Sequence, residues 1–170
     1  MNLYPKIYLK NVTQITQEII EKNKIKGFIL DVDNTLIDFD KKILPGAKEW
    51  IENLKKQGIK LVILSNSNKK EKVKMVAEKL DIPYLYFAKK PFKIGFKRAQ
   101  KILDLNTENI AVVGDQIFTD VIGANRSKMI SILVEPIDSK DIWVTKLKRP
   151  IEEYVIKMSL ENRISLFSKE

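Results

Sequence analysis

The chain has 170 residues, which predicts a single domain with a short extension. It contains no Cys and no His, which excludes a disulfide scaffold, thiol catalysis, a Ser-His-Asp triad and zinc sites built from those ligands. Its net charge is +9, and residues 41–101 carry seventeen basic and five acidic side chains, or +12. This excess of positive charge fits attraction of an anionic partner. Only four of the basic residues are Arg, so it fits a coding bias towards Lys equally well.

The hydrophobic pattern along the chain predicts alternating helices and strands. A helix is expected over residues 13–24, with Thr13 as its N-cap, and the first strand over residues 28–32. Helices and strands then alternate, with the helices over 45–57, 69–80, 93–103 and 119–127 and the strands over 60–64, 84–87, 110–113 and 130–134. Short, continuously apolar strands between helices predict an α/β fold, with helices on both faces of a parallel, five-stranded sheet.

Residues 1–135 are expected to form this domain, and residues 136–170 a C-terminal helical extension. Apolar side chains recur at near-helical spacing in the extension, so we expect it to pack on the domain or on a partner chain. A second interpretation is contact with a membrane surface through Trp143 and Leu147. The sequence has no apolar run of 18 residues and no signal-peptide pattern, so we expect a cytoplasmic protein, peripheral at a membrane in the second interpretation.

Three of the predicted strands end in polar clusters, namely DVDNT at 31–35, SNSN at 65–68 and GDQIFTD at 114–120. The carboxyl ends of parallel strands share the edge of the sheet where ligands bind, so these clusters should meet. Asp31 and Asp33 are two residues apart and can point to the same side, and Asp115 adds a third carboxylate. Converging carboxylates need a compensating cation, and a chain that offers only oxygen ligands favours Mg²⁺.

Residues beside these carboxylates are candidates for binding phosphate. Ser65 ends the second strand, where its hydroxyl and the following N–H groups, beginning with that of Asn66, can hold phosphate oxygens. Lys90 precedes the helix over 93–103 and can supply a positive charge, although Lys is common in this part of the chain.

Together these residues resemble the four motifs of the haloacid dehalogenase (HAD) superfamily. The run from Asp31 to Thr35 resembles its first motif, DxDxT, and Ser65, Lys90 and the GDQIFTD run match the second, third and fourth motifs in order. The resemblance covers residues 25–135 and implies a Rossmann-like fold. The finer pattern is similar to subfamily IIIA and, within it, to YqeG-type, phosphatidylglycerophosphatase-like proteins; it is carried by DVDNTL, by AKKP at 88–91, by VGDQIFTDVIGANR at 113–126 and by WVTKLKRP at 143–150.

This resemblance implies a phosphatase that forms an aspartyl-phosphate. Asp31 is then the nucleophile, and Asp33 protonates the leaving alkoxide and activates water. Mg²⁺ is held by Asp31, by the backbone carbonyl of Asp33 and by Asp115. A phospho-accepting receiver domain is disfavoured, because Asp33 provides the second carboxylate that hydrolysis needs.

The same resemblance implies supporting roles for four further residues. Ser65 and Lys90 neutralise the transferring phosphoryl group. Asp120 supports the metal or orients Lys90, and Thr35 is a structural hydroxyl in the turn.

The spacing between the motifs bears on the substrate. The intervals from Asp33 to Ser65 and from Ser65 to Lys90 are too short for the cap domain that many relatives carry, so we expect an open site. An open site suits a phosphate on a large or surface-bound molecule, and the first hypothesis is a phospholipid head group such as phosphatidylglycerophosphate. The alternatives are a phosphatase of small metabolites or proteins whose site is covered in a homo-oligomer and, less favoured, a nucleic-acid or ribosome-associated binding protein.

Overall fold

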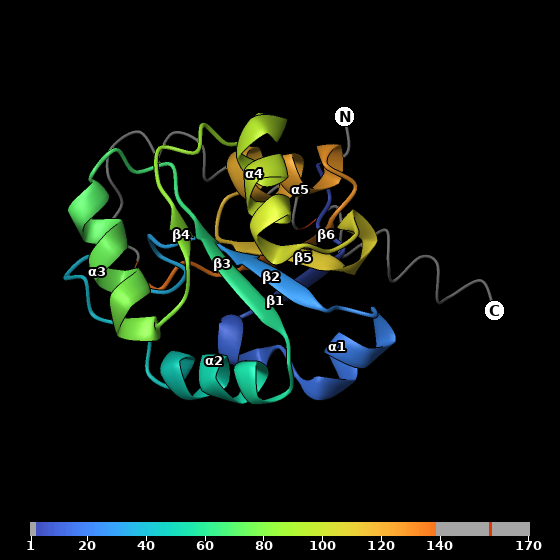
Figure 1. Ribbon diagram of the computed structural model, residues 1–170, viewed down its shortest axis with the longest axis horizontal. Helices are drawn as coiled ribbons and strands as arrows, with labels where there is room; N and C mark the ends of the chain where they lie inside the picture. Colours follow the sequence, from blue (N-terminus) through green and yellow to red (C-terminus); the bar gives the residue numbers. More distant parts are fainter. Residues whose placement is uncertain (1–2, 139–156, 158–170) are drawn as a thin grey trace.

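The computed structural model describes residues 3–138 and residue 157, and it consists of a central sheet with helices on both faces (Figure 1). All strand pairs in this sheet are parallel, and the strands lie in the order β1-β6-β5-β2-β3-β4. The predicted α/β class and parallel sheet are therefore confirmed. The predicted extension over 136–170, with Trp143 and Leu147, falls almost wholly outside the described residues, so it and the domain boundary at 135 stay predictions.

The predicted number of five strands is wrong, because the sheet has six. Its strands are β1 (Ile7–Leu9), β2 (Gly27–Leu30), β3 (Lys60–Leu64), β4 (Tyr84–Leu85), β5 (Ile110–Gly114) and β6 (Ile130–Val134). The missed strand is β1, an edge strand of three half-buried residues. It forms by pairing with β6, with Ile7 beside Ile132.

The helices follow the predicted order with shifted ends. They are η1 (Val12–Gln14), α1 (Gln17–Lys22), α2 (Ala47–Lys56), α3 (Lys70–Leu80), α4 (Lys93–Leu103), η2 (Thr107–Asn109), the π-helical turn η3 (Ile117–Val121) and α5 (Ile122–Arg126). The prediction that Thr13 caps the first α-helix is wrong. Thr16 is the cap, and its hydroxyl accepts a hydrogen bond from the N–H of Ile19 at 3.4 Å. Thr13 lies one turn earlier in η1, which is separated from α1 by the extended residue Ile15.

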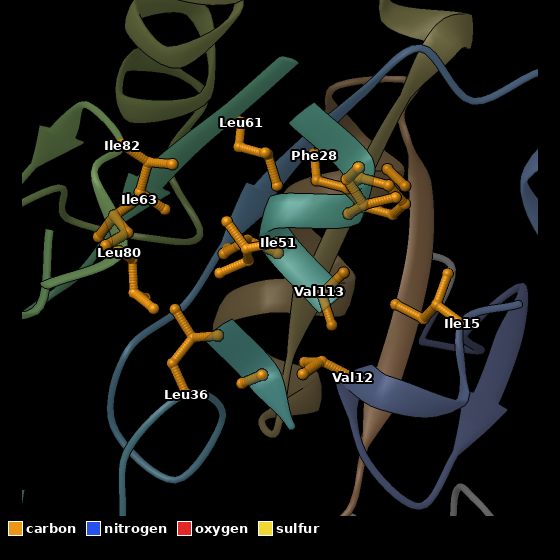
Figure 2. Close-up of a cluster of buried hydrophobic side chains, with 14 of the residues drawn as sticks. Val12, Ile15, Phe28, Leu36, Ile51, Leu61, Ile63, Leu80, Ile82 and Val113 are labelled. Atoms are coloured by element: carbon orange, nitrogen blue, oxygen red, sulfur yellow. The ribbon is translucent and has the colours of Figure 1, made fainter. Parts of the chain in front are cut away.

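Two hydrophobic cores lie on opposite faces of the sheet because successive strand residues point to opposite sides. Phe28 and Leu30 of β2 face the larger core, which α2 and α3 cover (Figure 2). Ile29, between them, faces the smaller core, which α4 covers with Phe96. Figure 1 shows α1 and α2 below the sheet and α4 and α5 above it. The sheet is thereby fixed between two packed layers, which makes the ends of its strands a rigid support.

The segments that leave the carboxyl ends of the strands are short. Between Asp33 and Ser65 the chain forms a flap over residues 34–46, in which Ile37 bridges to Ile43, followed by α2 and β3. Between Ser65 and Lys90 it forms α3 and β4. The residues that the structure describes therefore contain no cap domain, as predicted. A search of the same residues finds no helix long and apolar enough to cross a membrane.

Candidate active site

Three of the predicted site residues stand at the ends of adjacent strands. Asp31 follows β2, Ser65 follows β3 and Asp115 follows β5. The register places Leu30 of β2 between Ile63 and Val113, and the N–H of Asp31 continues this pairing by donating to the Val113 carbonyl at 2.9 Å. The strand pairing therefore brings together residues that are far apart in the sequence, at the edge that the sequence predicted.

Lys90 joins two carboxylates at the centre of this edge. Its ammonium group lies 2.6 Å from an oxygen of Asp31 and 2.6 Å from an oxygen of Asp120. The side chains of Lys90 and Asp120 are each 2% exposed and that of Asp31 is 11% exposed. Water is thus nearly excluded from both ion pairs, so each contact is stronger than a pair on the surface would be.

Asn66 fixes the backbone on which Lys90 is carried. The Asn66 side-chain oxygen accepts a hydrogen bond from the Lys90 N–H at 2.6 Å, and its side-chain nitrogen donates to the Lys90 carbonyl at 3.0 Å. Asn66 was predicted to contact phosphate. With both ends of its side-chain amide bonded to Lys90, the geometry favours a positioning role for this side chain.

Asp120 is placed by the π-helical turn η3 and by the absence of a side chain at Gly114. A Cβ at position 114 would lie 2.2 Å from the Asp120 carboxyl carbon, so only glycine fits there without displacing Asp120. The second Asp120 oxygen accepts hydrogen bonds from the Gln116 N–H and the Thr119 hydroxyl, both at 3.3 Å. These contacts leave the first oxygen directed at Lys90.

Asp31, Asp115 and Asp120 form a compact group of carboxylates. Each offers an oxygen, these oxygens lie within 4.8 Å of one another, and all three residues are buried. A buried set of hard oxygen ligands this close together fits a hard divalent cation such as Mg²⁺.

The electrostatics of the group reflect this crowding. Burial raises the pKa of Asp31 to about 7; the Lys90 ammonium opposes this shift, and the neighbouring carboxylates of Asp120 and Asp33 add to it. Burial alone would lower the pKa of Lys90, but the adjacent Asp120 and Asp31 outweigh it and raise the pKa above its usual value. Lys90 therefore stays charged, whereas the charge on Asp31 is costly to the folded protein unless a cation is bound.

Asp33 lies outside this group of three and is half-exposed. Its carboxylate is held by the Lys72 ammonium, at 2.5 and 2.7 Å from its two oxygens. The sequence did not single out Lys72, which is one of several lysines on α3 and shares no motif with Asp33. Only the fold, which sets the start of α3 beside the base of the flap, brings the two together.

The remaining predicted residues are buried in the turns that support the site. Ser65 is 1% exposed, and its hydroxyl oxygen accepts a hydrogen bond from the Ser67 N–H at 3.1 Å. Thr35 is also 1% exposed and lies in the turn after β2, where its N–H donates to the Val32 carbonyl at 3.3 Å. This location agrees with a structural role for Thr35.

Comparison with known proteins places the chain among phosphatases. The family model described as mitochondrial PGP phosphatase matches residues 1–137. The chain belongs to this family. It is 40% identical over 153 residues to the probable phosphatase YqeG of Bacillus subtilis, an alignment that covers 89% of this chain and 88% of that protein. It is 26% identical over 164 residues to phosphatidylglycerophosphate phosphatase 1, chloroplastic/mitochondrial, of Arabidopsis thaliana, covering 90% of this chain and 47% of the plant protein.

The family membership confirms the resemblance seen in the sequence. The chain is a HAD-type phosphatase, a phosphoric monoester hydrolase. Its fold is also found in a crystal structure of an uncharacterized protein from Corynebacterium glutamicum, with a TM-score of 0.58 and 21% identity. That likeness covers 73% of this chain and 93% of the other, and it concerns the fold alone.

Proposed function

We propose that this phosphatase is Mg²⁺-dependent, acts through an aspartyl-phosphate on Asp31 and takes a lipid-borne phosphomonoester as its substrate. One observation carries the chemical part of the proposal. The buried Lys90 forms an ion pair with Asp31, and Asp115 and Asp120 offer further carboxylate oxygens close to it. Asp31 and Asp115, with the Asp33 carbonyl, would hold the metal. When bound, Mg²⁺ would offset the charge of the carboxylates and of the phosphoryl group.

In the first half of the reaction an oxygen of Asp31 attacks phosphorus. A bond forms between this oxygen and phosphorus while the bond from phosphorus to the leaving alkoxide breaks. Asp33, in its protonated form, gives its proton to the alkoxide oxygen, so an alcohol leaves. This step requires Asp33 to part from Lys72, whose ammonium is then free to meet the anionic substrate.

The second half of the reaction regenerates the enzyme. Asp33, now a carboxylate, takes a proton from a water molecule, whose oxygen attacks phosphorus. The bond between Asp31 and phosphorus breaks and inorganic phosphate leaves. Lys90 and the backbone N–H groups after Ser65 stay fixed throughout, which suits them to stabilise charge on the transferring group.

Three observations support a lipid substrate, with phosphatidylglycerophosphate as the specific proposal. The matching family is described as a PGP phosphatase, and the plant relative is named as a phosphatidylglycerophosphate phosphatase. The described part of the chain has no cap to enclose a small metabolite. An open site allows a phosphate at a bilayer surface to reach Asp31 without leaving the membrane, and we propose a peripheral membrane enzyme that acts from the cytoplasm.

The test is phosphate release from vesicles that contain phosphatidylglycerophosphate, compared with soluble sugar and nucleotide phosphates, with Mg²⁺ and with EDTA. We expect Mg²⁺-dependent release with preference for the vesicles. Asp31→Asn should be inactive, whereas Asp104→Asn, which removes an exposed carboxylate just after α4, should be fully active. Preference for a soluble phosphomonoester would refute the lipid assignment and favour the metabolite phosphatase, and an active Asp31→Asn protein would refute the mechanism.

A further inference from the structure

Four large apolar side chains are exposed around the catalytic edge. Phe39 is 62% exposed, Phe87 53%, Phe92 61% and Ile94 64%. They come from three segments: Phe39 from the flap after β2, Phe87 from the end of the turn after β4, and Phe92 and Ile94 from the start of α4. Isolated exposed apolar residues are ordinary on protein surfaces, but a group at one edge indicates an interaction surface.

Backbone contacts place the segments that carry three of these residues beside the active site. The N–H of Phe87 donates to the Ser67 carbonyl at 2.9 Å, and that of Phe92 to the Lys89 carbonyl at 3.0 Å. Phe87 and Phe92 therefore flank the turn that carries Lys90. The start of α4 lies against the same turn, since a Cβ on Gly95 would come within 2.7 Å of the Ala88 carbonyl oxygen.

Phe39 lies in the flap, which leaves the same edge of the sheet after β2. Phe39 lies in a tight turn closed by hydrogen bonds between Asp38 and the backbone of Lys41 and Lys42. The flap begins at Asp33, whose carboxylate is bound to Lys72 of α3. The base of the flap is therefore fixed beside the first turns of α3, on the carboxyl side of the sheet.

Exposed lysines stand between these apolar residues. The Lys89 ammonium lies 5.2 Å from the centre of the Phe87 ring, and the Lys70 ammonium lies 5.9 Å from that of Tyr86. Phe39 is followed by the acidic residue Asp40 and then by Lys41 and Lys42, and Lys93 lies between Phe92 and Ile94. We use the term catalytic rim for the four apolar residues Phe39, Phe87, Phe92 and Ile94 together with these exposed lysines.

We propose that the catalytic rim is a docking surface for an anionic lipid bilayer, with Phe39, Phe87, Phe92 and Ile94 inserting between head groups and the lysines contacting lipid phosphates. The proposal deepens the proposed function, on which it rests, by stating how the site reaches a lipid. Apolar side chains that stand apart from one another can insert individually between lipid head groups, and the lysines among them can bind the anionic head groups. Nucleic-acid sites favour aromatic side chains that stack on bases and Arg side chains that bind phosphate, whereas the rim includes the aliphatic Ile94 and its basic residues are all Lys.

The first test measures binding alone. The full-length protein is sedimented with phosphatidylcholine vesicles that contain or lack phosphatidylglycerol, which is anionic but is not the proposed substrate. We expect binding that requires the anionic lipid. The triple variant Phe39→Gln, Phe92→Ser and Ile94→Gln should bind about tenfold more weakly or worse. Ile94→Gln should weaken binding more than Ile102→Gln, which removes an equally apolar, exposed side chain near the opposite end of α4.

A second matched pair tests the charges. Lys70→Gln, at the start of α3, should weaken binding about fivefold, whereas Lys79→Gln, at its far end, should have little effect. Equal binding of wild type and the triple variant, equal effects within either matched pair, or tighter binding to a single-stranded oligonucleotide than to vesicles would overturn the proposal. A change of oligomeric state in the triple variant without loss of vesicle binding would assign the rim to a second copy of the chain.

Hydrolysis of a soluble phosphomonoester separates this proposal from the proposed function. The triple variant should keep the wild-type rate on p-nitrophenyl phosphate and lose activity only on vesicle-borne substrate. If the wild type hydrolyses no phosphomonoester, the proposed function fails, while the sedimentation assay still decides whether the rim binds a bilayer. If it hydrolyses the soluble compound but does not bind anionic vesicles, the docking surface fails and the catalytic mechanism stands.

Discussion

Replacing the nucleophile should make the metal-free protein more stable. Folding raises the pKa of Asp31 from 3.8 to about 7, chiefly because burial disfavours the charged carboxylate. Each unit of pKa corresponds to about 1.4 kcal/mol, so holding this charge costs the folded state about 4 kcal/mol at about pH 8. Asn has nearly the same shape and no charge, and its side-chain oxygen can still accept from Lys90. We therefore expect Asp31→Asn to raise the free energy of unfolding by about 2–4 kcal/mol.

The stabilisation by Asp31→Asn should depend on pH, because protonation of Asp31 in the wild type removes the same negative charge that the substitution removes. As the pH rises above 3.8 the unfolded chain loses this proton, whereas the folded protein keeps it until about pH 7. The wild type therefore loses stability relative to Asp31→Asn across this interval. The difference should be small near about pH 4, should grow up to about pH 7 and should be constant above it.

Urea unfolding in EDTA, followed by tryptophan fluorescence at several pH values, measures this difference. Asp81→Asn is the control, since Asp81 is exposed and its hydrogen bond with Lys55 lowers its pKa, so the substitution should give no stabilisation. An Asp31→Asn protein that is no more stable than the wild type above pH 7, or that gains equally at all pH values, would refute the electrostatic account of the site.

Three further substitutions test how the site is held together. Lys90→Met should lower the free energy of unfolding by about 3–5 kcal/mol in urea and abolish hydrolysis, because it leaves buried carboxylates without their cation. Asn66→Ala removes two hydrogen bonds to the backbone of Lys90 and should cost about 1–2 kcal/mol of stability and lower kcat about tenfold; unchanged kcat would exclude the positioning role. Gly114→Ala should displace Asp120 and abolish activity in a protein that still folds. Gly123→Ala, with a comparable clash against Phe96, should lower thermal stability but leave kcat unchanged.

The sequence predicted the fold well where the signal is local. Continuous apolar runs bounded by Gly, Pro and polar clusters located five of the six strands of the sheet, and their alternation with helices predicted that the sheet is parallel. The strand β1 was missed because it forms by pairing with β6, more than a hundred residues away in the sequence. The helix start at Thr16 was misplaced because Thr13 offers the same capping side chain three residues earlier.

The site was predictable to the extent that it follows from topology. Residues at the carboxyl ends of parallel strands must meet at one edge, so Asp31, Ser65 and Asp115 needed no knowledge of side-chain packing. The residues that orient the catalytic side chains could not be predicted in this way. Lys72 reaches Asp33 across 39 positions and Asn66 reaches Lys90 across 24, and nothing in the spacing marks either pair. Such contacts depend on how a loop turns, which composition and periodicity do not encode.

The two outer strands of the sheet are its shortest, with three residues in β1 and two in β4. An unpaired strand edge is a template on which another polypeptide can extend the sheet, and this is a route to aggregation. Edges this short offer few backbone groups, so an incoming strand would gain too few hydrogen bonds to hold its register. The longer and more apolar strands are enclosed between their neighbours. The described sheet thus resists growth by strand addition.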